Sequence, residues 1–283
     1  MNAIEVKNLC KRYSGFALEN VSFTLPSGSI LGLVGENGAG KSTTISLIMN
    51  AVSRDAGSVS VLGADNRSDA FIGVKERIGV VLDEADFPEV LTPKNVNAVM
   101  KRTYRNWNEA HYAGALKRFD LPENKMFRDF SRGMKMKLAL AVALSHAPEL
   151  LILDEATSGL DPMIRDEMLD LFNDFTRDET HSILFSSHIV SDLEKICDYI
   201  AFLHKGRLLL CEEKDRLLEE YAVVRLPKAS FAALPPEAVH GKKTGAYGVE
   251  ALVRKSAVPR AFATERTSLE EIILFLAKGE DCR

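Results

Sequence analysis

The sequence has few cysteines, no paired cysteine motif and no long apolar stretch. Its 283 residues include four cysteines, which lie far apart at Cys10, Cys197, Cys211 and Cys282. This spacing fits free or buried thiols in a reducing compartment better than a disulfide framework or a zinc site. The longest apolar stretch, residues 138–144, is far shorter than the roughly 20 residues of a membrane-spanning helix. The first residues also lack a basic segment followed by an apolar one, so we expect neither a spanning segment nor a secretory signal.

An excess of positive charge is absent as well. Lysine and arginine number 36 against 40 aspartates and glutamates, the net charge is −4 and the pI is about 5.9. This balance gives no reason to expect nucleic acid as the main partner. Apolar residues make up 46% of the chain and charged residues 27%, which is ordinary for a globular protein and excludes a disordered or collagen-like chain. The length allows one or two domains.

The order of apolar runs predicts an α/β fold. Residues 4–6 and 21–25 alternate as strands do, and residues 29–34 form a continuous apolar run of the kind found in strands buried on both faces. Four similar runs follow at residues 150–153, 183–185, 199–203 and 208–210. Helical patterns separate most of these runs, so we expect a partly parallel sheet.

Two stretches differ from this α/β pattern. Residues of about 84–138 have helical periodicity with no strand-like run, which predicts an inserted helical subdomain. We expect one domain over residues 1–215 and a C-terminal extension over residues 216–283. Within the extension, residues 235–245 are rich in proline, glycine and lysine and predict a loop. Residues 268–278 predict an amphipathic helix, with Ser268 and Glu271 as a capping box.

A phosphate-binding motif follows the first buried run. The motif G-x-x-x-x-G-K-[ST] comprises Gly35, Glu36, Asn37, Gly38, Ala39, Gly40, Lys41 and Ser42, and Thr43 continues into the next helix. Glycines let the backbone N–H groups curl around phosphate oxygens, and the helix N-terminus adds its positive end. Lys41 provides a cation for the β- and γ-phosphates and Ser42 a hydroxyl for Mg²⁺. The sequence therefore predicts a nucleoside triphosphate site.

Acidic residues and a histidine end two later strands. Asp154 and Glu155 follow the apolar run 150–153, and His188 follows the run 183–185. At the end of a rigid strand, Asp154 can reach Mg²⁺ and Glu155 can polarise a water that attacks the γ-phosphate. The alternatives are a solvated strand end for the carboxylates and an ordinary surface position for His188. A phosphate loop in the same sheet favours the catalytic interpretation.

Taken together, the order of these motifs resembles the ATP-binding-cassette (ABC) ATPases. In that family's terms, Walker A is residues 35–42, Walker B is residues 150–154, the signature segment is residues 130–134 and the D-loop is residues 158–161. The resemblance covers about residues 2–215. It implies a P-loop NTPase core with an N-terminal antiparallel β subdomain, an inserted α-helical subdomain and a small C-terminal α+β extension.

The resemblance also assigns roles to single residues. It implies that Tyr13 stacks on adenine, and that Ser131 and Gly133 bind the γ-phosphate of ATP held by a second subunit. It places His188 at the γ-phosphate and Asp161 against that second subunit. The alternatives are a half-buried tyrosine of the N-terminal sheet for Tyr13 and plain helix caps for Ser131 and Asp161.

Two segments depart from the family pattern. The signature L-S-G-G-Q has Arg132 in place of its first glycine and Met134 in place of glutamine, whereas Ser131 and Gly133 are kept. Asp83 stands where the family has a glutamine that reaches Mg²⁺, so Asp83 is a further candidate ligand. The alternative is a solvated loop residue beside Glu84 and Asp86. These variants resemble the ABC-2-type, antibiotic-exporter branch.

The resemblance as a whole implies an ATP-hydrolysing subunit that powers a membrane transporter, favoured as an exporter, with ATP and Mg²⁺ as its cofactors. We expect a homodimer or a heterodimer with a homologous ATPase, and a separate transmembrane permease as partner. The expected location is cytoplasmic, on the inner face of the cell membrane. One alternative is a soluble ABC ATPase acting on nucleic acid or the ribosome, although the chain has a single Walker A and no sustained heptads. The other is a regulatory ATP-binding module, which the presence of both Glu155 and His188 disfavours.

Overall fold

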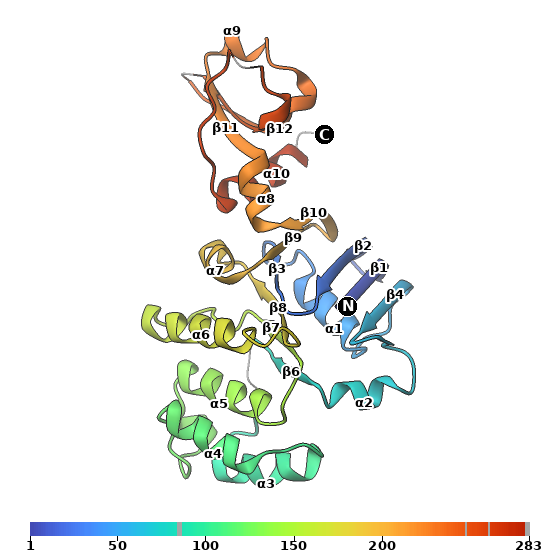
Figure 1. The fold of residues 1–283 in the computed structure, drawn as a ribbon, viewed down its shortest axis with the longest axis vertical. Helices are drawn as coiled ribbons and strands as arrows, with labels where there is room; N and C mark the ends of the chain where they lie inside the picture. The colour runs from blue at the N-terminus through green and yellow to red at the C-terminus, as the bar shows by residue number, and fades with distance from the viewer. Residues whose placement is uncertain (84–86, 247, 260, 281–283) are drawn as a thin grey trace.

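The computed structural model describes residues 1–83, 87–246, 248–259 and 261–280. The molecule is elongated, and its described residues form three sheets (Figure 1). A small sheet formed late in the chain lies at one end of the longest axis, and helices α3 (Pro93–Thr103) and α4 (Glu109–Arg118) lie at the other. A six-stranded sheet lies between these two ends.

The six-stranded sheet has the strand order β10-β9-β3-β8-β7-β6. Its strands are β3 (Ile30–Val34), β6 (Ile78–Val81), β7 (Leu150–Asp154), β8 (Ser182–Ser187), β9 (Tyr199–His204) and β10 (Arg207–Glu213). All neighbours pair in parallel except β10, which forms an antiparallel hairpin with β9. The predicted partly parallel sheet of an α/β fold is therefore confirmed.

The interiors of the central strands are apolar because both faces of the sheet are covered, and the buried serines of β8 (Ser182, Ser186 and Ser187) lie at its ends. In β7, Leu151 and Leu153 join the core beneath α5 (Arg132–Leu144), α6 (Pro162–Phe175) and α7 (Val190–Ile196). Leu150 and Ile152 point to the other face, where they pack with α1 (Lys41–Ile48) and the N-terminal sheet. Successive side chains of a strand alternate between faces, so a strand between two covered faces is mostly apolar.

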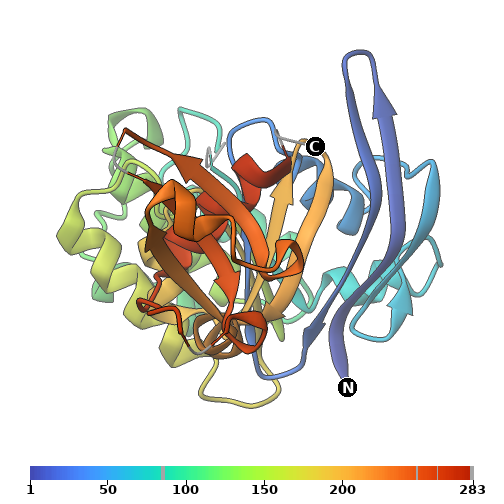
Figure 2. The ribbon, with the colours of Figure 1, turned by 90° about the horizontal axis from the view of Figure 1, so that it is seen from above.

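The N-terminal sheet is antiparallel and has the order β2-β1-β4-β5. Its strands are β1 (Asn2–Tyr13), β2 (Phe16–Pro26), β4 (Ala56–Val61) and β5 (Ala64–Asp65). The β1–β2 hairpin runs along one flank of the molecule (Figure 2). The short helix α2 (Phe71–Lys75) leads from this sheet back to β6.

Strand β6 was not predicted, although it completes the edge of the central sheet. Its four residues include Gly79, where a Cβ would lie 2.8 Å from the Ala143 carbonyl oxygen and 2.6 Å from Leu151 Cδ2. Only glycine lets α5 approach the strand this closely. Beyond β6, the described residues from Phe87 to Leu144 contain helices α3, α4 and α5 and the 3₁₀ turn η1 (Phe127–Asp129), as the helical periodicity predicts. Residues 84–86, where the helical subdomain was expected to begin, lie outside the described residues.

The last part of the chain forms a three-stranded antiparallel sheet, β11-β13-β12. Helix α8 (Lys214–Glu220) leads into β11 (Tyr221–Leu226). The short helix α9 (Lys228–Phe231) and the turn η2 (Pro236–Ala238) then precede β12 (Val239–Thr244). Strand β13 (Val249–Arg254) is followed by the turn η3 (Lys255–Ala257). The predicted loop over residues 235–245 was therefore wrong for most of its length. At Gly241 a Cβ would lie 2.1 Å from the Phe275 carbonyl oxygen, so the glycine serves close packing against a helix and not a loop.

That helix is α10 (Leu269–Glu280), the predicted amphipathic helix. Glu271 N–H donates to Ser268 Oγ and Ser268 N–H donates to Glu271 Oε2, both at 3.2 Å, which confirms the capping box. Leu269 and Ile272 are fully buried and belong to the main core, so α10 packs the C-terminal sheet against the central one. Among the described residues, no helix combines the length and hydropathy needed to cross a membrane.

Candidate functional site

The predicted phosphate loop lies between β3 and α1, at the carboxyl end of the parallel strands. Gly38 and Gly40 have φ values of +83° and +110°, which glycine alone adopts readily. A Cβ at Gly35 would lie 2.4 Å from the Leu203 carbonyl oxygen. The loop therefore curls tightly against β9 and directs the chain into α1. The first turn of a helix has backbone N–H groups without intrahelical partners, and these can bind an anion.

A hollow of about 550 Å³ opens above this loop. It is lined by Gly15, Phe16, Glu36, Asn37, Gly38, Gly40, Lys41, Ser42, Thr43, Asp83 and Glu155. The lining includes most of the predicted phosphate-loop residues together with Glu155, from the end of β7, and Asp83, which follows β6. Three segments distant in sequence thus meet where a triphosphate would lie.

Lys41 and Glu155 form a buried ion pair inside this hollow. Lys41 Nζ lies 3.2 Å from Glu155 Oε1 and donates to the Gly35 carbonyl oxygen at 2.7 Å. Nδ1 of His188 lies 2.7 Å from the other carboxylate oxygen, Glu155 Oε2. The structure therefore brings the three predicted catalytic side chains into one chain of contacts, although each comes from a different strand end.

The backbone of Glu155 is itself in an uncommon conformation. Its φ is +51°, in the left-handed region that costs a non-glycine residue free energy. Its N–H donates to the Ser186 carbonyl oxygen of the neighbouring strand β8 at 2.9 Å. This hydrogen bond holds the turn, so the Glu155 side chain points toward the phosphate loop and not along the strand.

Oxygen donors suited to Mg²⁺ lie beside the loop. Asp154 is 5% exposed, and its Oδ1 is buried without a hydrogen-bond partner among the described residues. Ser42 contributes a hydroxyl from α1, which packs against β7. No cluster of three or more His, Cys, Asp or Glu side chains in the described ranges is arranged to hold a metal alone. Mg²⁺ that arrives with a nucleotide takes one or two protein ligands and several phosphate oxygens, so this donor set fits it.

Asp83 has a partner that the sequence did not suggest. Arg132 Nη2 lies 2.9 Å from Asp83 Oδ1, and both side chains are about half exposed. The Arg132 guanidinium also covers Gly159, where a Cβ would lie 3.0 Å from its Cζ. Two of the three positions that depart from the family pattern are thus in direct contact. Glu84 and Asp86, which the alternative for Asp83 invoked, lie outside the described residues.

The predicted adenine contact, Tyr13, does not line the hollow. Its ring is 46% exposed, and Lys11 Nζ lies 5.5 Å from its centroid. Phe16, the register partner of Tyr13 on β2, lines the hollow instead and approaches Gly40. Sequence reasoning missed Phe16; its place three residues after Tyr13, across the hairpin turn, was the available signal. The role of Tyr13 stays a prediction.

The signature residues lie outside the hollow. Ser131 is the N-cap of α5 and its hydroxyl accepts from Met134 N–H at 3.3 Å, as the cap interpretation predicts. Gly133 packs against Ile164 of α6. Asp161 caps α6 by accepting from the N–H groups of Met163 and Ile164 at 3.1 Å. Neither Ser131 nor Gly133 lines the hollow of its own chain, and their phosphate contact stays a prediction.

A second, smaller cavity of about 200 Å³ separates the phosphate loop from α10. It is lined by Gly35, Glu36, His188 and His204 on one side and by Glu270, Ile273, Leu274 and Ala277 of α10 on the other, among others. His204 is 4% exposed, and its Nδ1 lies 3.3 Å from Glu36 Oε1. The C-terminal helix therefore borders the same loop that borders the large hollow.

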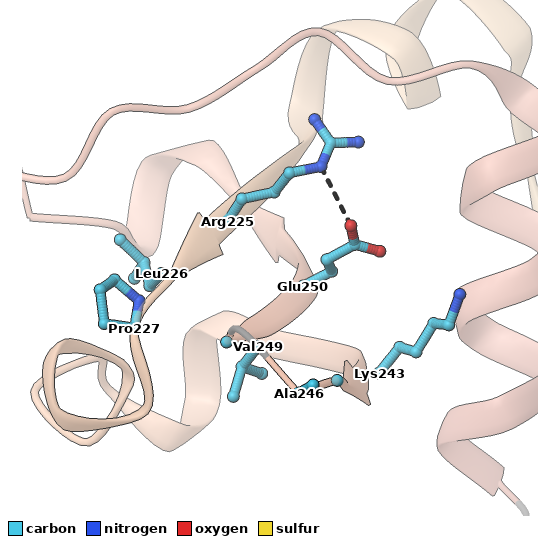
Figure 3. Close-up of a pocket in the computed structure, with 9 residues that line it drawn as sticks. Arg225, Leu226, Pro227, Lys243, Ala246, Val249 and Glu250 are labelled. Atoms are coloured by element: carbon cyan, nitrogen blue, oxygen red, sulfur yellow. Dashed lines mark hydrogen bonds and ion pairs between the residues drawn. The ribbon is translucent and has the colours of Figure 1, made fainter.

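A third hollow, of about 390 Å³, lies in the C-terminal sheet (Figure 3). Arg225 lines this hollow. Its guanidinium lies 3.2 Å from the Glu250 carboxylate and is also paired with Glu265 and Glu271. Hydrogen bonding to Glu265 is the main reason that the pKa of Arg225 is raised above its usual range. Arg225 is already paired with carboxylates, and Lys243 is a second cation that lines this hollow.

A glycine-rich turn between a buried parallel strand and a helix, with carboxylates at the end of another strand of the same sheet, is the defining arrangement of P-loop nucleoside triphosphatases. The comparisons with known proteins narrow this class. Residues 18–158 match the family model described as ABC transporter. The ABC transporter ATP-binding protein YtrB of Bacillus subtilis is 32% identical over 79% of this chain and 76% of its own length. This chain belongs to the ABC transporter ATP-binding proteins, and it is an ATPase.

Two further relatives agree with this family. The lantibiotic transport ATP-binding protein SrtF of Streptococcus pyogenes is 33% identical over 75% of this chain and 91% of its own length. A solved structure described as the ATP binding subunit of an ABC transporter is similar to this chain with a TM-score of 0.69 and 29% identity. The match covers 77% of this chain and 92% of the chain in that structure. The P-loop NTPase core expected from the sequence is therefore confirmed.

Proposed function

We propose that this chain is the ATPase subunit of a membrane exporter and that two such subunits enclose ATP in a head-to-tail sandwich. The observation that carries the hydrolytic part is the chain of contacts from Lys41 through Glu155 to His188 beside the phosphate loop. The transport part is supported by the family and by relatives such as SrtF, which is named for lantibiotic transport.

In the proposed reaction, Glu155 accepts a proton from the water that attacks the γ-phosphate. His188 donates to Glu155 Oε2 and so fixes the orientation of the carboxylate. Lys41 exchanges its contact with the Gly35 carbonyl oxygen for the phosphate oxygens of the nucleotide, where its charge counters the charge that develops on them. Ser42 and Asp154 are the residues proposed to hold Mg²⁺, which would neutralise phosphate charge.

The proposed dimer explains why the signature residues lie away from their own hollow. Ser131 and Gly133 begin α5, whose first-turn N–H groups attract anions. In a head-to-tail pair, the start of α5 in one subunit lies over the nucleotide of the other. Asp161, at the start of α6, would then lie against the second subunit. The proposed domains are residues 1–215 for the ATPase and residues 216–283 for the extension.

The proposed membrane partner is a separate permease on the cytoplasmic face of the membrane. The helical segment that contains α3 and α4 lies at the far end of the molecule from the C-terminal sheet, which leaves it available for such a contact (Figure 1). The alternative of a regulatory ATP-binding module predicts nucleotide binding without turnover. Steady ATP hydrolysis that increases when a permease is reconstituted with the chain would support the transport subunit and exclude the regulatory module.

The sandwich is tested with Glu155→Gln. The amide keeps the shape of the side chain but accepts no proton, so hydrolysis should fall by about 10²–10⁴-fold while nucleotide binding persists. Size-exclusion chromatography with Mg²⁺ and ATP should show a dimer for this variant. Glu109→Gln, on α4 and paired with Lys101, makes the same chemical change far from the hollow and is the control. A Glu155→Gln protein that binds ATP but elutes as a monomer would overturn the sandwich.

A further inference from the structure

The contact between Asp83 and Arg132 joins two segments that serve different nucleotide sites in the proposed dimer. Asp83 lines the hollow of its own chain together with Lys41 and Ser42. Arg132 is the first residue of α5, next to Ser131, and so belongs to the surface proposed to face the second subunit. Their ion pair, at 2.9 Å across 49 residues of sequence, is the direct link between these two surfaces.

Arg132 is held on two sides. One nitrogen donates to Asp83, and the rest of the guanidinium lies over the backbone of Gly159 in the D-loop. Gly159 has a φ of +67°, and a side chain there would fill the space that the guanidinium occupies. The Arg132 guanidinium thus lies between Asp83 and the D-loop, and its position depends on a residue that lines the nucleotide hollow.

The carboxylate of Asp83 has two competing cations. A hard divalent cation binds a carboxylate oxygen strongly, whereas an exposed Arg–Asp pair is weak because water screens it. In the contact that the structure shows, Arg132 neutralises Asp83. When Mg²⁺ and the triphosphate enter beside Ser42, the metal is the stronger partner for the same oxygen.

We propose that Arg132 and Mg²⁺ compete for the carboxylate of Asp83, so that binding of the metal and nucleotide releases Arg132 at the start of α5. Arg132 acts as a positioning residue: it controls Asp83 and does not touch the nucleotide of its own chain. Release leaves a free guanidinium beside Ser131, on the surface that faces the other nucleotide in the proposed sandwich. This second step therefore rests on the proposed sandwich. Loading of one site would thereby prepare the other.

The first test measures nucleotide binding without turnover. A fluorescent, non-hydrolysable ATP analogue is titrated in EDTA and in saturating Mg²⁺. The magnesium effect is the Kd in EDTA divided by the Kd in Mg²⁺. Arg132→Gln should increase this ratio by about 1.5- to 5-fold, the weight of an exposed ion pair, because the freed carboxylate repels the bare triphosphate and binds the metal without competition. Asp83→Asn should lower the ratio.

The decisive comparison is the double variant. If the two side chains act through each other, Arg132→Gln should leave the ratio unchanged in the Asp83→Asn background. Arg128→Gln removes an equally exposed arginine from the same segment, whose partner is Asp129 at 3.9 Å, and should match the wild type. An Arg132→Gln effect that persists in the Asp83→Asn background, or that Arg128→Gln reproduces, would overturn the competition.

The second test addresses the released arginine. In the Glu155→Gln background, Arg132→Gln should weaken the dimer formed with Mg²⁺ and ATP, whereas Arg128→Gln should not. An unchanged dimer would overturn the role of the released guanidinium. If Glu155→Gln alone gives no dimer, the sandwich fails, but the Kd ratios, which need only single subunits, still decide the competition for Asp83.

Discussion

His188 Nδ1 lies 2.7 Å from Glu155 Oε2, although 33 residues separate the two along the chain. They follow adjacent parallel strands, β8 and β7, so their positions at one edge of the sheet are set by strand pairing. The other oxygen of Glu155 is paired with Lys41. Glu155 therefore has a cation or a hydrogen-bond donor on each oxygen, and this arrangement leads to specific expectations.

His188→Ala should lower kcat with little change in the KM for ATP. The variant removes a hydrogen bond to a charged carboxylate, which is worth about 1.5–3 kcal/mol, or about 10- to 150-fold in rate if it acts only in the transition state. Steady-state ATPase kinetics measure both constants. His111→Ala, at an exposed position on α4, is the control and should leave both unchanged. A rise in KM without a fall in kcat would show that His188 binds substrate and does not orient Glu155.

Lys41→Ala should lose most of the affinity for ATP. The ammonium is the phosphate loop's side-chain cation, and a hydrogen bond to a charged group contributes about 1.5–3 kcal/mol, so we expect a loss of about 10- to 150-fold in Kd. Isothermal calorimetry with ATP and Mg²⁺ measures it. Lys75→Ala removes an exposed lysine of α2 and should bind ATP normally. Equal ATP binding by both variants would refute the phosphate-loop assignment.

Tyr13→Ala should weaken ATP binding, whereas Tyr13→Phe should not. The exposed ring has an open face on which a base can stack, and such stacking is worth about 1–3 kcal/mol. The loss should be similar for ATP and GTP, because every base has a π-face. Phe16→Ala is the comparison, since Phe16 lines the hollow. If Phe16→Ala loses base affinity and Tyr13→Ala does not, the stacking residue is Phe16.

Stability should fall on acidification because of His146. This imidazole is 1% exposed and stacks on Tyr104 at 4.1 Å, and burial lowers the pKa of His146 below its usual value of 6.5. The folded state therefore binds fewer protons than the unfolded state just below pH 6.5. The resulting stability is fully present above pH 6.5 and is lost as the pH falls through the lowered pKa.

Thermal unfolding between pH 7.5 and 5.5 tests this expectation. The slope from one such group is at most about 1.4 kcal/mol per pH unit. His146→Gln should flatten the pH dependence of Tm, whatever its effect on Tm itself. His111→Gln, at an exposed site, should keep the wild-type slope. Parallel pH profiles for the wild type and His146→Gln would exclude His146 as the source.

Features that depend on neighbouring residues were predictable from the sequence. The phosphate loop needs its glycines, lysine and serine in one short stretch, and its geometry follows from them. Helix caps also depend on residues that are close in sequence, and the local patterns predicted them. The capping residues are Ser131, Asp161, and the pair Ser268 and Glu271. The apolar runs likewise predicted the central strands, because the interior of a strand covered on both faces is mostly apolar.

Long-range packing decided the rest. Gly79 and Gly241 resemble loop residues in the sequence, but each admits a helix backbone against a strand, so β6 and β12 are known only once α5 and α10 are in place. The contact of Asp83 with Arg132 is likewise known only from the tertiary structure, because it depends on how closely the residue after β6 and the start of α5 approach each other. Residue spacing specifies turns and caps within a few residues, whereas contacts across 49 residues depend on how sheets and helices pack.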